Sequence, residues 1–203
     1  IIPMLRGNYR SVPMDYVLED ARRLAAAGVK ELNIVAQETT TWGKDIYGEK
    51  RLHELLRELC KVEGIRWIRL LYCYPEEITD ELIDVIRTEP KICHYLDMPI
   101  QHSSDAILRR MGRRTSRSEL ETVIGKLRKA IPDITLRTTL ITGFPGETEE
   151  DHEDLKSFVR KMEFDRLGVF MYSPEEGTPA EKMAGQVPEE LKESRRDELM
   201  LLQ

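Results

Sequence analysis

The chain has 203 residues, of which 40% are hydrophobic and 33% are charged, and its formal net charge is −6. This length and composition allow a sizeable buried core and exclude an intrinsically disordered protein. No apolar run approaches the roughly 20 residues that a membrane-spanning helix needs, so we expect no membrane partner. The negative net charge argues against a general nucleic-acid-binding protein.

The chain alternates between segments with helical and strand periodicity. In chain order we expect a helix over 14–27, a strand over 29–37, a helix over 51–62, a strand over 66–75, a helix over 79–88, a strand over 94–101, helices over 104–112 and 116–130, a strand and turn over 135–146, a helix over 148–162, a strand over 166–174 and a closing helix over 188–203. Thr79, the pair Ser116 and Glu119, and the pair Thr148 and Asp151 are expected to cap three of these helices.

Five strands that are each followed by helical sequence predict an α/β fold with parallel strands and right-handed crossovers. Five strands are too few for a closed eight-stranded barrel, so an open or partial barrel is favoured over a flat doubly wound sheet. The chain opens with a loop and a helix, which predicts a βα unit whose strand lies upstream. With no repeat or linker, residues 1–203 are expected to form one N-terminally incomplete domain.

The three cysteines, Cys60, Cys73 and Cys93, are far apart and form no C-x-x-C pair. They are expected to be buried free thiols in a reducing cytoplasm, and to form neither disulfides nor a metal site. We expect His53 and His152 on helix surfaces.

Active sites of parallel βα folds form at the carboxyl ends of the strands. In this sequence those ends carry amides, hydroxyls, one arginine and glycines, and no P-loop, G-x-G-x-x-G, H-E-x-x-H or G-x-S-x-G motif is present. His102 also lies there, as a polar loop residue or, alternatively, a catalytic base. Such a set suits the binding of a polar small molecule with a ribose, and would leave the hard chemistry to a cofactor.

Six segments, taken in order, resemble a known family. They are IPxxRGxxRS at the start, GVKELNIVAQETTxWGxDIYGE, LLYCYPEEI, YLDMPIQHSSDAILRRMGR, TLRTTLITGFPGETEED and FMYSPEEGTPA. Together they resemble the radical S-adenosylmethionine (SAM) domain of the methylthiotransferases. The branch that modifies an aspartate of the twelfth small-subunit ribosomal protein (RimO-type) is the most similar, and the tRNA-modifying branch (MiaB-type) is the alternative.

The resemblance implies a partial (βα)6 TIM-like barrel that reductively cleaves S-adenosylmethionine. It also implies a [4Fe-4S] cluster held by a C-x-x-x-C-x-x-C motif just upstream of Ile1. A preceding methylthiotransferase domain with a second [4Fe-4S] cluster and a following small β-barrel (TRAM) domain would complete the protein. Because this chain has none of the cluster cysteines, it would supply no metal ligand and would be inactive alone.

The resemblance also assigns roles to residues of this sequence. Cofactor contacts are expected from Gln37, Gln101, Ser103, Arg137, Thr139, Gly143 and Tyr172, and lower-ranked substrate contacts from Arg6 and Arg10. Gln37 would contact the methionine amino group and Arg137 the carboxylate. Gly143, together with Gly146, would let the backbone approach the adenine or ribose closely.

Two features leave alternatives open. The arginine run Arg109–Arg117 is either a solvated face or a contact to ribosomal RNA, and in the second case the chain could be a non-catalytic ribosome-docking module. The acidic run 147–154 is expected at a helix N-terminus. A reductant protein is an expected partner. A barrel aldolase or isomerase is a disfavoured third alternative, because it needs a strand-end lysine or carboxylate pair and none is found in the sequence.

Overall fold

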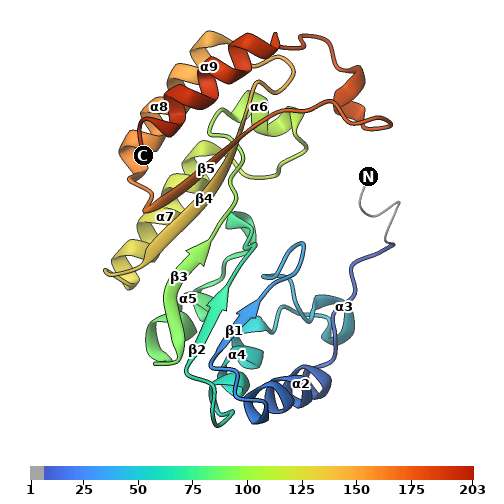
Figure 1. Ribbon diagram of the computed structural model, residues 1–203, viewed down its shortest axis with the longest axis vertical. Coiled ribbons are helices and arrows are strands. Elements are labelled where there is room, and N and C mark those ends of the chain that lie inside the picture. Colours follow the sequence, from blue (N-terminus) through green and yellow to red (C-terminus); the bar gives the residue numbers. More distant parts are fainter. Residues whose placement is uncertain (1–6) are drawn as a thin grey trace. The chain divides into compact units, whose positions relative to one another are not determined.

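The computed structural model describes residues 7–203, which form two compact units (Figure 1). The N-terminal unit contains the described residues up to Asp97 together with 126–134, and the C-terminal unit contains 98–125 and 135–203. Arg6, one of the predicted substrate contacts, lies outside the described residues.

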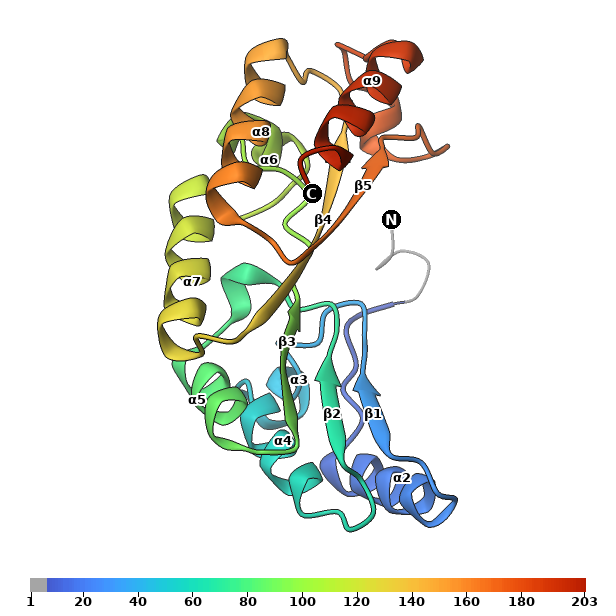
Figure 2. The same ribbon diagram turned by 60° about the vertical axis from the view of Figure 1, so that its left-hand side comes forward.

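The N-terminal unit is a three-stranded parallel arrangement with helices packed on it. Its elements are α2 (Met14–Ala26), β1 (Glu31–Ile34), α3 (Lys44–Tyr47), α4 (Leu52–Cys60), β2 (Trp67–Leu70), the 3-10 turn η1 (Pro75–Glu77), α5 (Asp80–Thr88) and β3 (Ile92–Asp97). β2 pairs in parallel with both β1 and β3. Figure 2 shows α4 and α5 on one side of these strands, and the fully buried Leu56, Ile68 and Ile86 belong to the core there.

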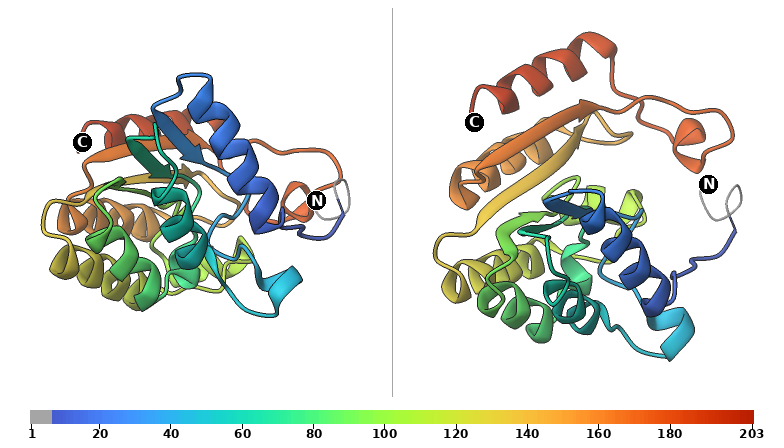
Figure 3. Two further views of the ribbon diagram at one scale, coloured as in Figure 1. Left: turned by 90° about the horizontal axis from the view of Figure 1, so that it is seen from below. Right: turned by 60° about the horizontal axis from the view of Figure 1, so that its bottom comes forward.

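The C-terminal unit is built on two parallel strands. Its elements are α6 (Asp105–Arg110), the first part of α7 (Arg117–Ala130), β4 (Thr135–Thr142), α8 (Glu149–Met162), β5 (Arg166–Met171), the 3-10 turn η2 (Pro179–Lys182) and α9 (Glu189–Met200). β4 and β5 stay in register from Arg137–Arg166 to Thr142–Met171, and α9 runs beside β5 (Figure 3).

The capping predictions are confirmed at all three helices. The Thr79 hydroxyl accepts a hydrogen bond from the Leu82 amide, and Ser116 and Glu119 exchange backbone-to-side-chain bonds. Thr148 and Asp151 form a complete capping box at the start of α8. Such bonds satisfy amide groups that the first helical turn leaves without partners.

The predicted parallel α/β strands are confirmed, although the first two are shorter than predicted and span only Glu31–Ile34 and Trp67–Leu70. The third strand ends at Asp97, before Pro99, since proline cannot donate to a strand ladder. The single turn α3 was not predicted, because Gly43 and Gly48 flank it in left-handed conformation and its four residues carry no periodicity.

The three cysteines are free, as predicted, although only Cys73 is fully buried. Within residues 7–203 no helix combines the length and apolar character that crossing a membrane requires.

The prediction that His152 lies on a helix surface is wrong. His152 is fully buried, and its Nε2 lies 3.3 Å from the Glu198 carboxylate. His102 is also fully buried, with Nδ1 accepting a hydrogen bond from the Ser104 amide at 2.9 Å. Both histidines are next to polar residues in the sequence, so the hydrophobic pattern did not predict that they are buried. Burial lowers the pKa of His102 from 6.5 to about 4.

The depressed pKa of His102 predicts an acid-sensitive fold. Between pH 7 and pH 5 the unfolded chain takes up a proton at this position that the native state excludes, so stability falls as the pH drops. His102→Asn removes this titration and keeps an acceptor for the Ser104 amide. We expect the unfolding free energy of the parent to fall by about 2 kcal/mol more than that of the variant over this range, measured by urea denaturation.

The matched control is His53→Asn, on α4 of the other unit, which shows what replacement of a histidine by asparagine does elsewhere in the chain. Equal pH dependence of the parent and His102→Asn would contradict the assignment.

Candidate cofactor-binding site

One face of the β4–β5 pair carries the polar groups predicted for cofactor binding. Burial alternates along β4, with Leu136, Thr138, Leu140 and Thr142 buried and the intervening residues partly accessible. Because paired residues of parallel strands share a face, Arg137 and Thr139 lie on the same face as their partners Arg166 and Gly168. The sequence therefore brings a guanidinium and a hydroxyl onto one accessible sheet surface.

The same face leaves room for a ligand. Gly168 has no side chain, and a Cβ there would meet Arg137 Nη2 only at 3.9 Å and Phe170 Cε2 only at 4.0 Å. Phe170 is 61% exposed, which is unusual for a phenylalanine within a strand. An exposed ring, an open glycine and a guanidinium together suit a ligand with a flat base and a carboxylate.

Gln101 is held against this strand by its main chain. Its amide donates to the Thr139 carbonyl at 3.0 Å, and its carbonyl accepts from the Ile141 amide at 2.8 Å. Gln101 adopts a left-handed conformation (φ 71°), which is uncommon for a residue other than glycine and marks a position fixed by its surroundings. The structure thus places Gln101 beside Thr139, as the predicted shared site requires.

Ser103 lies apart from that face. It is fully buried, and its hydroxyl donates to the Asp154 carboxylate at 3.2 Å, on α8. The next residue, Ser104, donates its hydroxyl to Asp151 at 2.6 Å. The Ser103 hydroxyl is therefore bonded to α8. Ser103 could influence a ligand only through the position of its loop.

The loop after β4 is organised by Glu147, which was expected only as part of an acidic run at a helix N-terminus. Its side chain is fully buried and accepts hydrogen bonds from the amides of Gly143 at 2.6 Å and Phe144 at 3.3 Å and from the Thr142 hydroxyl. Burial raises the pKa of Glu147, and the Arg195 guanidinium at 3.0 Å opposes that shift. Glu149 to Asp151, by contrast, do occupy the first turn of α8 as predicted.

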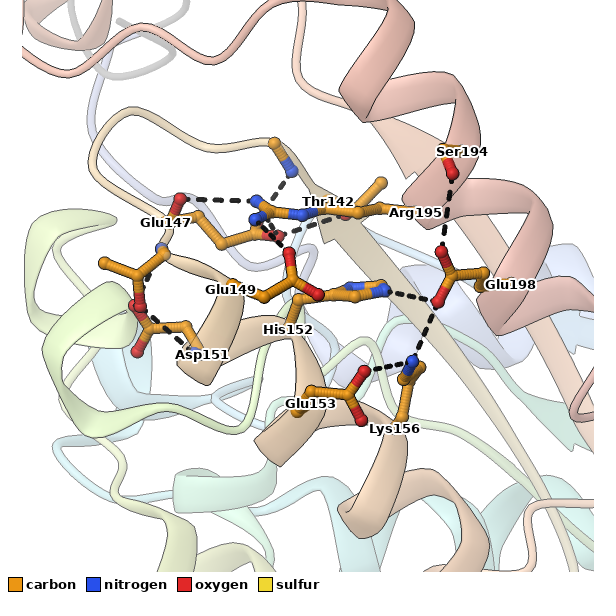
Figure 4. A network of polar contacts seen from close by, with 12 residues as sticks. Thr142, Glu147, Glu149, Asp151, His152, Glu153, Lys156, Ser194, Arg195 and Glu198 are labelled. Carbon is orange, nitrogen blue, oxygen red and sulfur yellow. Dashed lines mark hydrogen bonds and ion pairs between the residues drawn. The ribbon is translucent and has the colours of Figure 1, made fainter.

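Figure 4 shows Arg195 reaching from α9 to Glu147, with His152 and Glu198 in the same network. Arg195 was not singled out from the sequence. It lies on the buried face of α9 with Lys192 and Leu199, and charged residues at such positions give no apolar stripe. In the sequence, only the four-residue spacing between Gly143 and Glu147 indicated that the Glu147 carboxylate could bond to the amides of its own loop.

Gly143 and Tyr172 have structural surroundings that the sequence did not predict. A Cβ on Gly143 would overlap the Lys192 side chain, so this glycine makes room for α9 on that side. Tyr172 is 8% exposed and packs edge-on against Phe144, with ring centroids 5.2 Å apart. Its hydroxyl is buried and has no hydrogen-bond partner among the described residues.

In the N-terminal unit the predicted residues are separate from one another. Gln37 is exposed on the bend after β1, where the neighbouring Glu38 carboxylate accepts hydrogen bonds from the Thr40 and Thr41 amides. Arg10 lines a pocket of about 280 Å³ together with Asn33 and other residues of the unit, and Gln37 is not part of its wall.

The described residues provide no ligand set for an iron–sulfur cluster. No three His, Cys, Asp or Glu side chains within residues 7–203 are grouped to hold a metal. Burial raises the thiol pKa of Cys60 to about 11 and raises that of Cys73 further, whereas cluster ligation needs thiolates.

Comparison with known proteins agrees with the resemblance found in the sequence. The radical SAM superfamily model matches residues 2–159. Over all 203 residues the chain is 66% identical to the ribosomal protein uS12 methylthiotransferase RimO of Lachnoclostridium phytofermentans and 56% identical to that of Clostridium perfringens, and it covers 46% of each. The chain therefore spans about half the length of the curated relatives it matches.

A solved structure, that of the radical SAM enzyme coproporphyrinogen III oxidase (HemN) from Escherichia coli, aligns with 93% of this chain and 44% of its own, with a TM-score of 0.66 and 20% identity. At that identity the likeness concerns the fold alone, and it confirms the predicted α/β partial barrel. Since the family model covers well over half of the chain, the protein belongs to the radical SAM superfamily.

Proposed function

We propose that this chain is the SAM-binding core of a methylthiotransferase that modifies an aspartate of ribosomal protein uS12. The observation that carries the proposal is 66% identity to a RimO protein along all 203 residues. The tRNA-modifying alternative is not favoured, because the Lachnoclostridium and Clostridium relatives are both uS12 methylthiotransferases.

Membership of the superfamily implies S-adenosylmethionine and a [4Fe-4S] cluster as cofactors. Together they supply reductive cleavage of the sulfonium when bound. No group of three His, Cys, Asp or Glu side chains within residues 7–203 could hold a cluster, and the role proposed for this chain is to bind and orient the organic cofactor. A second cluster on a preceding domain, and a TRAM domain after the chain, belong to the same proposal for the whole protein.

The proposed cofactor face is that of β4 and β5. Arg137 would pair with the cofactor carboxylate, because a guanidinium binds a carboxylate through two parallel hydrogen bonds. Thr139 and Gln101 would offer polar groups beside it. We retain Gln37 as a proposed contact to the methionine amino group, and Arg10 as a substrate contact.

Two of the remaining predicted contacts are proposed to act through the main chain, and the third through a bond that holds its loop. Gly143 and Tyr172 would present backbone atoms, since the glycine is packed against Lys192 and the tyrosine ring lies in the core. Ser103 would hold the loop that follows Gln101 through its bond to Asp154.

The arginine run offers less surface to ribosomal RNA than the sequence suggested. Arg110 donates to the carbonyls of Pro145 and Ala184, and Arg117 pairs with Asp154 and Glu121. Arg109 and Arg114 are exposed. We propose an RNA contact only for that exposed part, alongside uS12 as substrate and a reductant protein as partner, in a cytoplasmic setting.

The substrate assignment predicts a specific product. The natural protein, with iron and sulfide restored, is incubated with SAM, a reductant and a sulfide source, and is offered ribosomal protein uS12 or unmodified tRNA. Mass spectrometry of the digested products should place a methylthio group on one uS12 aspartate and none on tRNA. A modified tRNA adenosine would refute the assignment, and an absence of reductive SAM cleavage would refute the radical SAM function itself.

The role of Arg137 predicts a selective loss of SAM affinity. Arg137→Met removes the carboxylate partner and keeps the length of the side chain, so we expect the SAM dissociation constant to rise about tenfold or more. Arg166→Met is the matched control, because Arg166 is the register partner of Arg137 on β5. Equilibrium dialysis with labelled SAM measures both variants, and equal weakening by the two would argue against a specific site at Arg137.

A further inference from the structure

Helix α9 buries two cations one turn apart. Lys192 and Arg195 retain 4% and 2% of their exposure, respectively. The spacing i, i+3 puts both on the same side of the helix. Burying a charge is costly unless it is paired and hydrogen-bonded, so their contacts show what these side chains hold in place.

Arg195 holds the loop after β4 through both the side chain and the main chain of one residue. Its Nη1 donates to the Glu147 carboxylate at 3.0 Å and to the Glu147 carbonyl at 3.2 Å. The same carboxylate accepts the amides of Gly143 and Phe144. The Arg195 guanidinium therefore holds the Glu147 carboxylate, which in turn holds the turn at Gly143 and Phe144. Figure 4 shows the contact between Arg195 and Glu147.

Lys192 touches both strand ends. Its Nζ donates to the Tyr172 carbonyl, one residue after β5, at 2.9 Å. Its aliphatic stem fills the space that a side chain on Gly143 would need. Gly143 has a left-handed conformation (φ 72°), so a larger residue there would be strained even without the lysine.

Tyr172 in turn is bonded to β4, because its amide donates to the Thr142 carbonyl at 2.8 Å. The two cations thus join the ends of β4 and β5 into one rigid unit. Neither cation lies within residues 2–159, which the family model matches.

We propose that Lys192 and Arg195 are positioning residues for SAM: α9 holds the loops at the carboxyl ends of β4 and β5 in the arrangement that binds the cofactor. This inference rests on the proposed SAM-binding role of those strands. A well-packed apolar pair could satisfy the core as well as a buried ion pair does. The hydrogen bonds of Lys192 and Arg195, by contrast, fix the positions of the Gly143 and Tyr172 main chain. Apolar contacts are not directional and would fix those positions less precisely.

Two single variants test the proposal in the natural protein with its iron and sulfide restored. Arg195→Met leaves Glu147 without its cation, and Lys192→Met keeps the stem against Gly143 but removes the bond to Tyr172. We expect the SAM dissociation constant and the KM for SAM to rise about tenfold in each, because small misplacements of binding groups are costly. The kcat for SAM cleavage at saturating SAM should stay within about twofold.

Three further variants separate positioning from general stability. Arg195→Lys should recover part of the SAM affinity. The neutral pair Glu147→Gln with Arg195→Met should bind SAM better than Arg195→Met alone, because no uncompensated charge remains buried. Leu199→Ala, a fully buried position on the same helix, should lower thermal stability without a tenfold loss of SAM affinity.

Hydrogen–deuterium exchange gives a readout that is independent of activity. Without SAM, the amides of 143–147 should exchange faster in Arg195→Met than in the parent, and at parental rates in Leu199→Ala. If the parent binds SAM and both single variants bind it equally well, the positioning role is overturned. If the parent itself does not bind SAM, the proposed function fails and this inference fails with it.

Discussion

The buried carboxylate of Glu147 is the interaction on which the C-terminal unit depends. It accepts two backbone amides from the loop after β4 and the hydroxyl of Thr142 at the end of β4, and it pairs with a guanidinium from α9. An ionised carboxylate without those partners would be expensive to bury. The Glu147 carboxylate therefore holds the loop, the end of β4 and the last helix together. Removing one of its bonding partners would leave part of the carboxylate unsatisfied.

Because the bonds to Glu147 fix the end of β4, the accessible face of β4 and β5 can carry polar side chains in defined positions. The buried face of β4 packs in the core, while Arg137 and Thr139 lie on the other face beside Gly168. Gln101 is bonded to the same strand by its own main chain. The polar groups are thus carried by regular strands rather than by flexible loops, which favours a binding site that exists before its ligand arrives.

Periodicity and capping residues predicted the strands and the main helices, because each of those signals is local. The short turn α3 was missed, since four residues between two glycines have no period. Burial of His152, Lys192 and Arg195 could not be predicted, because it depends on partners 20 to 50 residues away. The sequence predicted that Gln101 follows the third strand and that Arg137 and Thr139 belong to the fourth, and the structure places both of these residues within β4. The surroundings of Gly143 and Ser103 required the structure.

The accessible face and the carboxyl ends of β4 and β5 are proposed to bind S-adenosylmethionine. Hydrogen–deuterium exchange of the reconstituted natural protein, with and without SAM, tests this proposal most directly. If SAM binds there, its addition should slow amide exchange in segments 139–147 and 168–174 and leave the exchange of α4 unchanged. Protection that leaves both of these segments unchanged, and that falls elsewhere in the chain, would contradict it.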